Sequence, residues 1–380
     1  MIIEGLPLAE LKKRKSFKWR GYPEDVLPLP VAEMDFEIDA SIRNLLIQML
    51  EKSDTGYLGP VPELSANFAK FAKERWGWGV DPEQIFTATD VGVGMVEFGR
   101  TIVKPGDKIV FNTPVYHNIL NWINELKCTP VDAPLHKDEL SYTLDFKAVE
   151  EAYKTGAKAH FLCNPQNPVG TVFTKEELSK LADLAKKYGV TIFSDEIHAP
   201  LVYKEHEFVP FLAVSQTARE VGVCVTAASK SWNLAGLKCA MIITQDPIQK
   251  ERALSMPEAV HYRASLFGAL AAAQAFISTQ WLDSTLETLD RNRKYLADEL
   301  SKKLPTVGYR IPDCSYLAWL DVSSLNLGQD PAQTLLEKGK VAFNPGIAFG
   351  PASGQFIRLN FGTSRELISE GIDRIVNAIK

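Results

Sequence analysis

Residues 190–198 read VTIFSDEIH, an apolar run of strand length that ends in two carboxylates and a histidine. Similar apolar runs lie on either side of it in the sequence, at residues 159–163 (AHFLC) and 221–226 (VGVCVT). Helical sequence separates the first two runs, because Thr174 and Glu177 have the spacing of a helix-capping box. Strands that are apolar throughout and alternate with helices are typical of a mostly parallel sheet with helices on both faces.

The alternation extends outward from this stretch. Residues 21–30 are rich in proline, and we expect no regular structure there. After residue 279 a long helical pattern precedes short strand-like pieces and a last helix. We therefore predict an α/β fold in three parts: an N-terminal segment (1–40) that packs with the small domain, a large domain (41–280) and a small α+β C-terminal domain (281–380). Apolar patterning predicts strands at residues 108–111, 240–244, 316–320 and 356–360, and helices at residues 39–52, 118–126, 174–188 and 281–303.

Composition excludes several classes of function. A net charge of −5 disfavours a nucleic-acid partner, which would need a clustered basic surface. The five cysteines are odd in number and lack C-x-x-C spacing, so we expect neither a disulfide framework nor a zinc site. The most apolar run, residues 264–277, is shorter than the ~20 residues that a membrane span needs. We expect a cytoplasmic enzyme with no membrane, nucleic-acid or metal partner.

Polar side chains follow the three central apolar runs. Asn167 comes after the first, Asp195 after the second and Lys230 after the third. Each has an ordinary explanation when taken alone: a turn residue, a helix cap and a solvated lysine. Because ligands of open α/β sheets bind at the carboxyl ends of the strands, the three together predict one shared site.

A lysine amine condenses with an aldehyde, and pyridoxal phosphate (PLP) is the cofactor built on that reaction. Its ring nitrogen needs a carboxylate partner, which Asp195 supplies, and Asn167 is placed to bind the ring hydroxyl. The phosphate needs backbone N–H groups, hydroxyls and a cation. The candidates for those donors are the turn at residues 89–94 (TDVGVG), Ser229 and Lys238.

Further motifs give the whole chain a resemblance to a known family. It resembles the fold-type-I PLP enzymes of the class I/II aminotransferase superfamily, and within them the MalY and PatB group of cystathionine β-lyases. The resemblance implies a large PLP-binding domain with a mostly parallel sheet and a smaller α+β domain. The motifs occur in family order and are VAEMDF (31–36), TGY (55–57), PGD (105–107), TPVYH (113–117), NPQNPVG (164–170), SDEIH (194–198), SKSWNLAGLK (229–238) and IRLNF (357–361).

The resemblance implies a role for each matching residue. Lys230 carries PLP and moves the substrate Cα proton, while Asp195 pairs with the ring nitrogen. Asn167 binds the ring hydroxyl and contributes to the substrate site. Tyr116 stacks on the ring, and Arg358 binds the substrate α-carboxylate, a bidentate task that suits a guanidinium. Simpler interpretations stay open, with Tyr116 as a core aromatic and Arg358 as a surface ion-pair residue.

The resemblance also implies a shared, dimeric site. Tyr57 is similar to the tyrosine that reaches the phosphate and substrate of the neighbouring subunit, which implies a homodimer; as a simpler alternative it is only an interface residue. His198 lies where it would contact the cofactor; as a simpler alternative it is a structural histidine satisfied within the protein. The phosphate is expected to be bound by Ser229, Lys238 (alternatively a solvated lysine) and the backbone of Val91 and Gly92.

Three departures bear on the reaction. Aminotransferases usually have Tyr at the position of His198, whereas His is typical of the lyase group. Pro30 stands where the lyase group usually has Trp, and Ala227 replaces a phosphate-binding hydroxyl of several aminotransferases. The phosphate should therefore depend more on Ser229 and the backbone.

We predict a PLP-dependent carbon–sulfur β-lyase that cleaves L-cystathionine, related cysteine S-conjugates or cysteine to a thiol, pyruvate and ammonia. The alternatives are an aminotransferase on the same scaffold and a PLP-binding regulatory protein. The preferred thiol amino acid stays open, as does the group that protonates the leaving sulfur, Tyr116 or Lys230.

Overall fold

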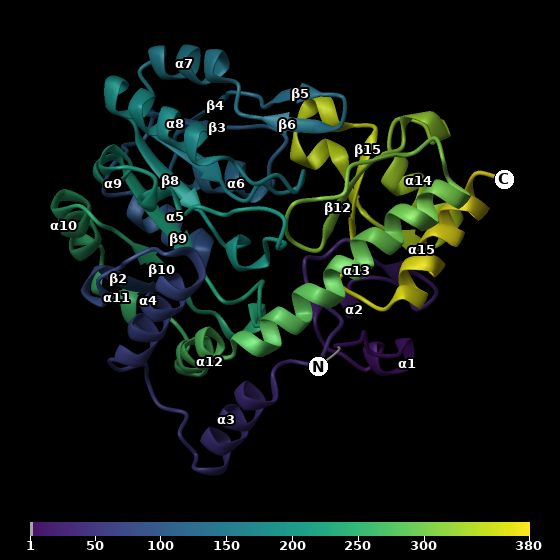
Figure 1. The fold of residues 1–380 in the computed structure, drawn as a ribbon, viewed down its shortest axis with the longest axis horizontal. Coiled ribbons are helices and arrows are strands. Elements are labelled where there is room, and N and C mark those ends of the chain that lie inside the picture. The colour runs from purple at the N-terminus through teal and green to yellow at the C-terminus, as the bar shows by residue number, and fades with distance from the viewer. Residues whose placement is uncertain (1–2) are drawn as a thin grey trace.

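The centre of the molecule is a seven-stranded sheet with the order β2-β10-β9-β8-β7-β3-β4 (Figure 1). The structure is a computed structural model and describes residues 3–380. Five neighbouring strands, from β9 to β4, are parallel, and β10 is antiparallel to both of its neighbours. The strands are β2 (Ile85–Ala88), β3 (Lys108–Phe111), β4 (Thr129–Asp132), β7 (Ala159–Cys163), β8 (Thr191–Asp195), β9 (Gly222–Thr226) and β10 (Ala240–Ile243). The predicted α/β class is confirmed.

Successive residues of the central strands pack into two different apolar clusters. Phe161 and Phe193 belong to a cluster with α5 and α6, whereas Leu162 and Ile192 belong to a cluster with α7, α8 and α9. Because side chains alternate along a strand, helices therefore cover both faces of the sheet. These helices are α5 (Val91–Gly99), α6 (Asn118–Glu125), α7 (Phe146–Lys154), α8 (Lys175–Tyr188) and α9 (Gln216–Val221).

Helix α8 begins and ends where its sequence signals predict. Thr174 and Glu177 form both hydrogen bonds of a capping box. Gly189 ends the helix in the left-handed region, at φ 67°, where a residue without Cβ is favoured. Further helices are α3 (Ala40–Glu51), α4 (Pro62–Trp76), α10 (Pro247–Ser255), α11 (Glu258–Tyr262) and α12 (Leu266–Ile277), and of these α3 projects away from the sheet (Figure 1).

The last hundred residues form a second, antiparallel sheet with the order β11-β12-β15-β14. Helix α13 runs from the region of α12 to this sheet, where it lies beside α15 (Figure 1). The elements are α13 (Thr279–Lys303), β11 (Gly308–Tyr309), β12 (Leu317–Asp321), α14 (Pro331–Gly339), β13 (Val341–Ala342), β14 (Asn344–Pro345), β15 (Phe356–Asn360) and α15 (Arg365–Ala378). A hairpin of β5 (His136–Asp138) and β6 (Ser141–Thr143) forms a separate two-stranded sheet. The α+β character agrees with the predicted small domain, and its boundary at residue 281 stays a prediction.

The prediction that residues 21–30 lack regular structure is wrong at Leu27 and Pro28. These residues form β1, which pairs in parallel with β13 of the C-terminal part. The backbone N–H groups of Leu27 and Leu29 donate to Lys340 and Ala342. Burial of this apolar stretch removes its backbone from water, so the strand pairing satisfies its hydrogen bonds.

A buried ion pair fixes residues 31–36 in the core. Lys18, from α2 (Phe17–Arg20), lies 2.6 Å from the carboxylate of Asp35, and neither side chain is exposed. Trp19 donates its indole N–H to the same carboxylate, and Arg14, after α1 (Leu8–Leu11), donates to the carbonyls of Met34 and Phe36. The N-terminal segment thereby holds residues 31–36 in place.

None of the helices within residues 3–380 has the length and apolar character that crossing a membrane requires.

We expect Lys18→Met to lower the free energy of unfolding by about 3–5 kcal/mol, because it removes the nearer cation of a buried carboxylate and leaves only Arg14, 3.9 Å away. Chemical denaturation measures the change. The double variant Lys18→Met/Asp35→Leu is the control, since it removes both charges and should recover most of the loss. A double variant as unstable as the single one would attribute the loss to packing.

Candidate active site

The parallel strands β7, β8 and β9 deliver their following residues to one edge of the sheet. Cys163 is in register with Asp195, and Asp195 with Val225. A cavity of about 580 Å³ lies at this edge. All the predicted site residues line it except Tyr57, namely Val91, Gly92, Tyr116, Asn167, Asp195, His198, Ser229, Lys230, Lys238 and Arg358. The structure thus brings together side chains from both predicted domains.

Asp195 is a buried carboxylate with few partners. Its Oδ1 accepts the backbone N–H of Ile197 at 3.1 Å. Burial raises the pKa of Asp195 to about 7, and that hydrogen bond and the nearby Lys230 lower it only in part. A cationic N–H group at this position would keep the carboxylate ionised. Asp195 therefore fits the protonated ring nitrogen of PLP.

Lys230 has the properties of a reactive amine. Its Nζ donates to the carbonyl of Ala32 at 3.1 Å. Burial, together with the positive charge of Arg358, lowers the pKa of Lys230 to about 8. A larger fraction of the amine is therefore neutral near physiological pH than for an ordinary lysine, and the neutral amine is the form that condenses with an aldehyde.

Arg358 lies in the middle of β15 and is buried without a carboxylate. Its Nη1 donates to Asn167 Oδ1 at 2.9 Å, and its Nη2 donates to the Pro30 carbonyl and Asn344 Oδ1 at 3.0 and 3.1 Å. Its Nε has no partner among residues 3–380, and the charges near enough to shift its pKa are those of Tyr116 and Tyr316, with no carboxylate of those residues among them. Burial lowers the pKa of Arg358 to about 10. Because a buried unpaired charge is costly, the site favours a ligand that carries a carboxylate.

Two further groups have defined protonation states. Asn118 donates from Nδ2 to the hydroxyl oxygen of Tyr116 at 2.6 Å, which leaves the phenol proton free to donate elsewhere. Burial raises the pKa of Tyr116, so this hydroxyl is a donor rather than a base at neutral pH. His198 lies 3.1 Å from the Ser315 hydroxyl, and burial lowers the pKa of His198 to about 3, so that it stays neutral.

The N-terminus of α5 offers the predicted phosphate site. Asp90 caps the helix by accepting the N–H of Val93 at 2.9 Å, and the N–H groups of Val91 and Gly92, the first two of the helix, have no partner within it. Lys238 also borders the cavity, but its Nζ pairs with Asp90 Oδ2 at 3.0 Å and is half-exposed. Lys238 is therefore neither a free solvated lysine nor an unshared positive charge.

The sequence interpretation missed several cavity residues. Asn118 and Trp122 lie one helical turn apart on α6, which begins two residues after Tyr116, so their spacing is a signal that could have found them. Asn344 and the carbonyl of Pro30 bind Arg358 from distant elements, and no local pattern marks them.

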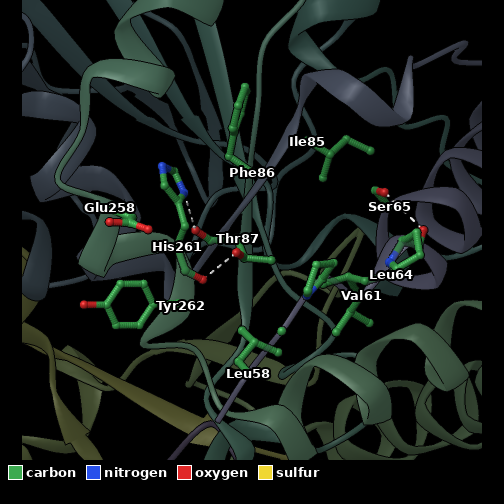
Figure 2. Close-up of a pocket in the computed structure, with 13 residues that line it drawn as sticks. Leu58, Val61, Leu64, Ser65, Ile85, Phe86, Thr87, Glu258, His261 and Tyr262 are labelled. Carbon is green, nitrogen blue, oxygen red and sulfur yellow. Dashed lines mark hydrogen bonds between the residues drawn. The ribbon is translucent and has the colours of Figure 1, made fainter.

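A second pocket, of about 540 Å³, lies on a different surface (Figure 2). Apolar residues of the segment before α4 and of β2 form most of it, with α11 at one side. The Thr87 hydroxyl donates to the backbone carbonyl of His261 at 2.7 Å, and His261 Nδ1 lies 3.2 Å from the Thr87 carbonyl, so one ring nitrogen of this histidine has a partner within the protein (Figure 2). Tyr57 directly precedes Leu58, the first residue that lines this pocket. Its side chain is 99% exposed and does not line the active-site cavity of its own chain.

The fold and the site define a member of the aminotransferase class I and II family, to which residues 24–375 of the chain match. The predicted family is therefore confirmed. The chain is 36% identical to the cystathionine β-lyase of Corynebacterium glutamicum, with 98% of this chain and 99% of that protein covered. It is 32% identical to cystathionine β-lyase PatB of Bacillus subtilis, at 96% and 97% coverage.

The fold agrees with a solved structure over its whole length. Cystalysin from Treponema denticola, whose crystal structure contains a pyridoxal 5′-phosphate cofactor, superposes with a TM-score of 0.93. It is 27% identical, and the match covers all of this chain and 99% of that one.

The lowered pKa of Lys230 predicts how cofactor attachment depends on pH. In cofactor-free protein, the rate of covalent PLP attachment should rise with pH and level off above about 8, because the neutral amine reacts. Stopped-flow absorbance measures the rate, and Lys230→Ala is the control without attachment. A midpoint near 10 would contradict the effect of burial.

Proposed function

We propose that this chain is a PLP-dependent carbon–sulfur β-lyase that cleaves L-cystathionine and related cysteine S-conjugates or cysteine. The observation that carries the proposal is one cavity shared by the amine of Lys230, the buried carboxylate of Asp195 and the carboxylate-free guanidinium of Arg358. Full-length similarity to cystathionine β-lyases supports it.

Each polar residue of the cavity has a separate role in the proposed reaction, and its charge decides that role. PLP, when bound, supplies an aldehyde and an electron-withdrawing ring that stabilises negative charge at the substrate Cα. Asp195 holds positive charge at the ring nitrogen, and Asn167 Nδ2 is free for the ring hydroxyl because its Oδ1 is occupied by Arg358. Arg358 binds the α-carboxylate and so orients the Cα–H bond toward Lys230. The amine of Lys230 removes that proton.

Loss of the β-sulfur completes the reaction. The Cβ–S bond breaks, its electron pair leaves with the thiolate, and a proton makes it a thiol. Tyr116 suits this donation, because it is protonated at neutral pH and its hydroxyl oxygen already accepts from Asn118. Hydrolysis of the remaining three-carbon fragment gives pyruvate and ammonia; with L-cystathionine the thiol is L-homocysteine.

The decisive assay uses purified, PLP-loaded protein with L-cystathionine and no keto acid. We expect continuing release of pyruvate and free thiol in a 1:1 ratio. Lys230→Ala is the matched control and should release neither. Turnover that begins only after a keto acid is added would make the chain an aminotransferase, and absence of both reactions would favour the regulatory alternative.

We also propose that the chain acts as a homodimer in which Tyr57 completes the site of its partner. Helix α3, which projects from the body of the molecule (Figure 1), carries exposed apolar side chains, and so does the wall of the pocket in Figure 2, where Tyr262 lies. An exposed apolar surface of this kind is typical of an interface. Its members are Ile47, Leu50, Tyr57, Tyr262 and Ile277.

Mixed dimers test this arrangement. A dimer of one Tyr57→Ala chain and one Lys230→Ala chain has one doubly impaired site and one intact site if Tyr57 acts across the interface. Refolding the two impaired variants together should therefore restore about a quarter of the wild-type activity, since about half of random dimers are mixed. Activity no higher than the mean of the two variants would place Tyr57 in its own subunit or outside the site.

A further inference from the structure

The phosphate site at the start of α5 has few donors. Asp90 occupies the N–H of Val93 and shares the charge of Lys238. Ala227, on the cavity wall, has no hydroxyl to contribute. Within this chain, the remaining donors among the predicted residues are the N–H groups of Val91 and Gly92 and the Ser229 hydroxyl.

Trp122 lies against this site from the neighbouring helix α6. A Cβ atom placed on Gly92 would lie 2.7 Å from Trp122 Nε1, so the indole N–H approaches the backbone of the first turn of α5 as closely as a glycine allows. The same indole lines the cavity and contacts Tyr116 edge to face, at 6.1 Å between ring centroids. Its nitrogen therefore lies beside the N–H groups that would bind the phosphate.

The indole N–H of Trp122 also lacks an acceptor within residues 3–380. Three other tryptophans donate theirs to protein oxygens, namely Trp19 at 2.9 Å, Trp78 at 2.8 Å and Trp232 at 3.4 Å, whereas the buried indole nitrogen of Trp319 has no partner among residues 3–380. An indole nitrogen only donates, so an anionic oxygen is a suitable acceptor for it.

We propose that Trp122 is an additional phosphate-binding residue, which donates its indole N–H to the phosphate of PLP beside the backbone of Val91 and Gly92. The proposal rests on the placement of the phosphate at α5 given above. Gly92 then has two tasks: it exposes its own N–H, and its missing side chain makes room for the indole. Trp122 thus supplies a donor where Ala227 supplies none.

The experiment compares the affinity of the cofactor-free protein for PLP and for pyridoxal, which lacks the phosphate. Trp122→Phe keeps a ring and removes the N–H. We expect its dissociation constant for PLP to rise about tenfold, as for loss of a hydrogen bond to a charged group, and that for pyridoxal to stay unchanged. The ³¹P resonance of the bound phosphate should shift, which gives a readout independent of turnover.

The control is Trp281→Phe on α13, a partly buried indole that does not line the cavity. Neither the affinity ratio nor the ³¹P resonance should change in it. Gly92→Ala provides a second test, because the added methyl group displaces the indole and should weaken PLP binding more than pyridoxal binding.

Two results would overturn the proposal. Equal affinity losses for PLP and pyridoxal in Trp122→Phe, or no loss for either, would mean that the N–H does not contact the phosphate. Wild-type protein that binds pyridoxal as tightly as PLP would reject the placement of the phosphate itself, and the two failures are thereby distinguishable.

Discussion

The parallel hydrogen bonding of β7, β8 and β9 is the constraint on which the site depends. It aligns Cys163 with Asp195 and Asp195 with Val225, so that the residues after each strand emerge at one edge. A shift of one residue in β8 would turn Asp195 toward the opposite face of the sheet. The apolar clusters on both faces oppose such a shift, because it would also expose Ile192 and Phe193 to the wrong neighbours.

Residues 30–36 connect this edge to the C-terminal sheet. The carbonyl of Ala32 accepts from both Lys230 Nζ and the Tyr316 hydroxyl, and the carbonyl of Pro30 accepts from Arg358. Asn360 binds the carbonyls of residues 31 and 33. The buried Lys18–Asp35 pair anchors the other end of the stretch. A segment without regular structure thus fixes the distance between the reactive amine and the guanidinium.

Burial shifts the charged groups of the cavity toward their neutral forms. It raises the pKa of Asp195 to about 7 and lowers that of Lys230 to about 8 and that of Arg358 to about 10. A ligand that brings a cation to Asp195 and a carboxylate to Arg358 offsets the cost of burying these two charges. The electrostatics of the cavity therefore favour an amino acid joined to a cationic ring.

The sequence by itself determined the class of the fold and most of the site. Apolar runs bounded by turn residues predicted the strands, and the capping box predicted the start of α8. The motifs around Asn167, Asp195, Lys230 and Arg358 identified the family. These signals are local, so they can be read along the chain. Tertiary structure alone decided the pairing of Leu27 with β13, the acceptors of Arg358 and the approach of Trp122 to Gly92. Those contacts join residues far apart in sequence, and only packing brings their atoms within reach.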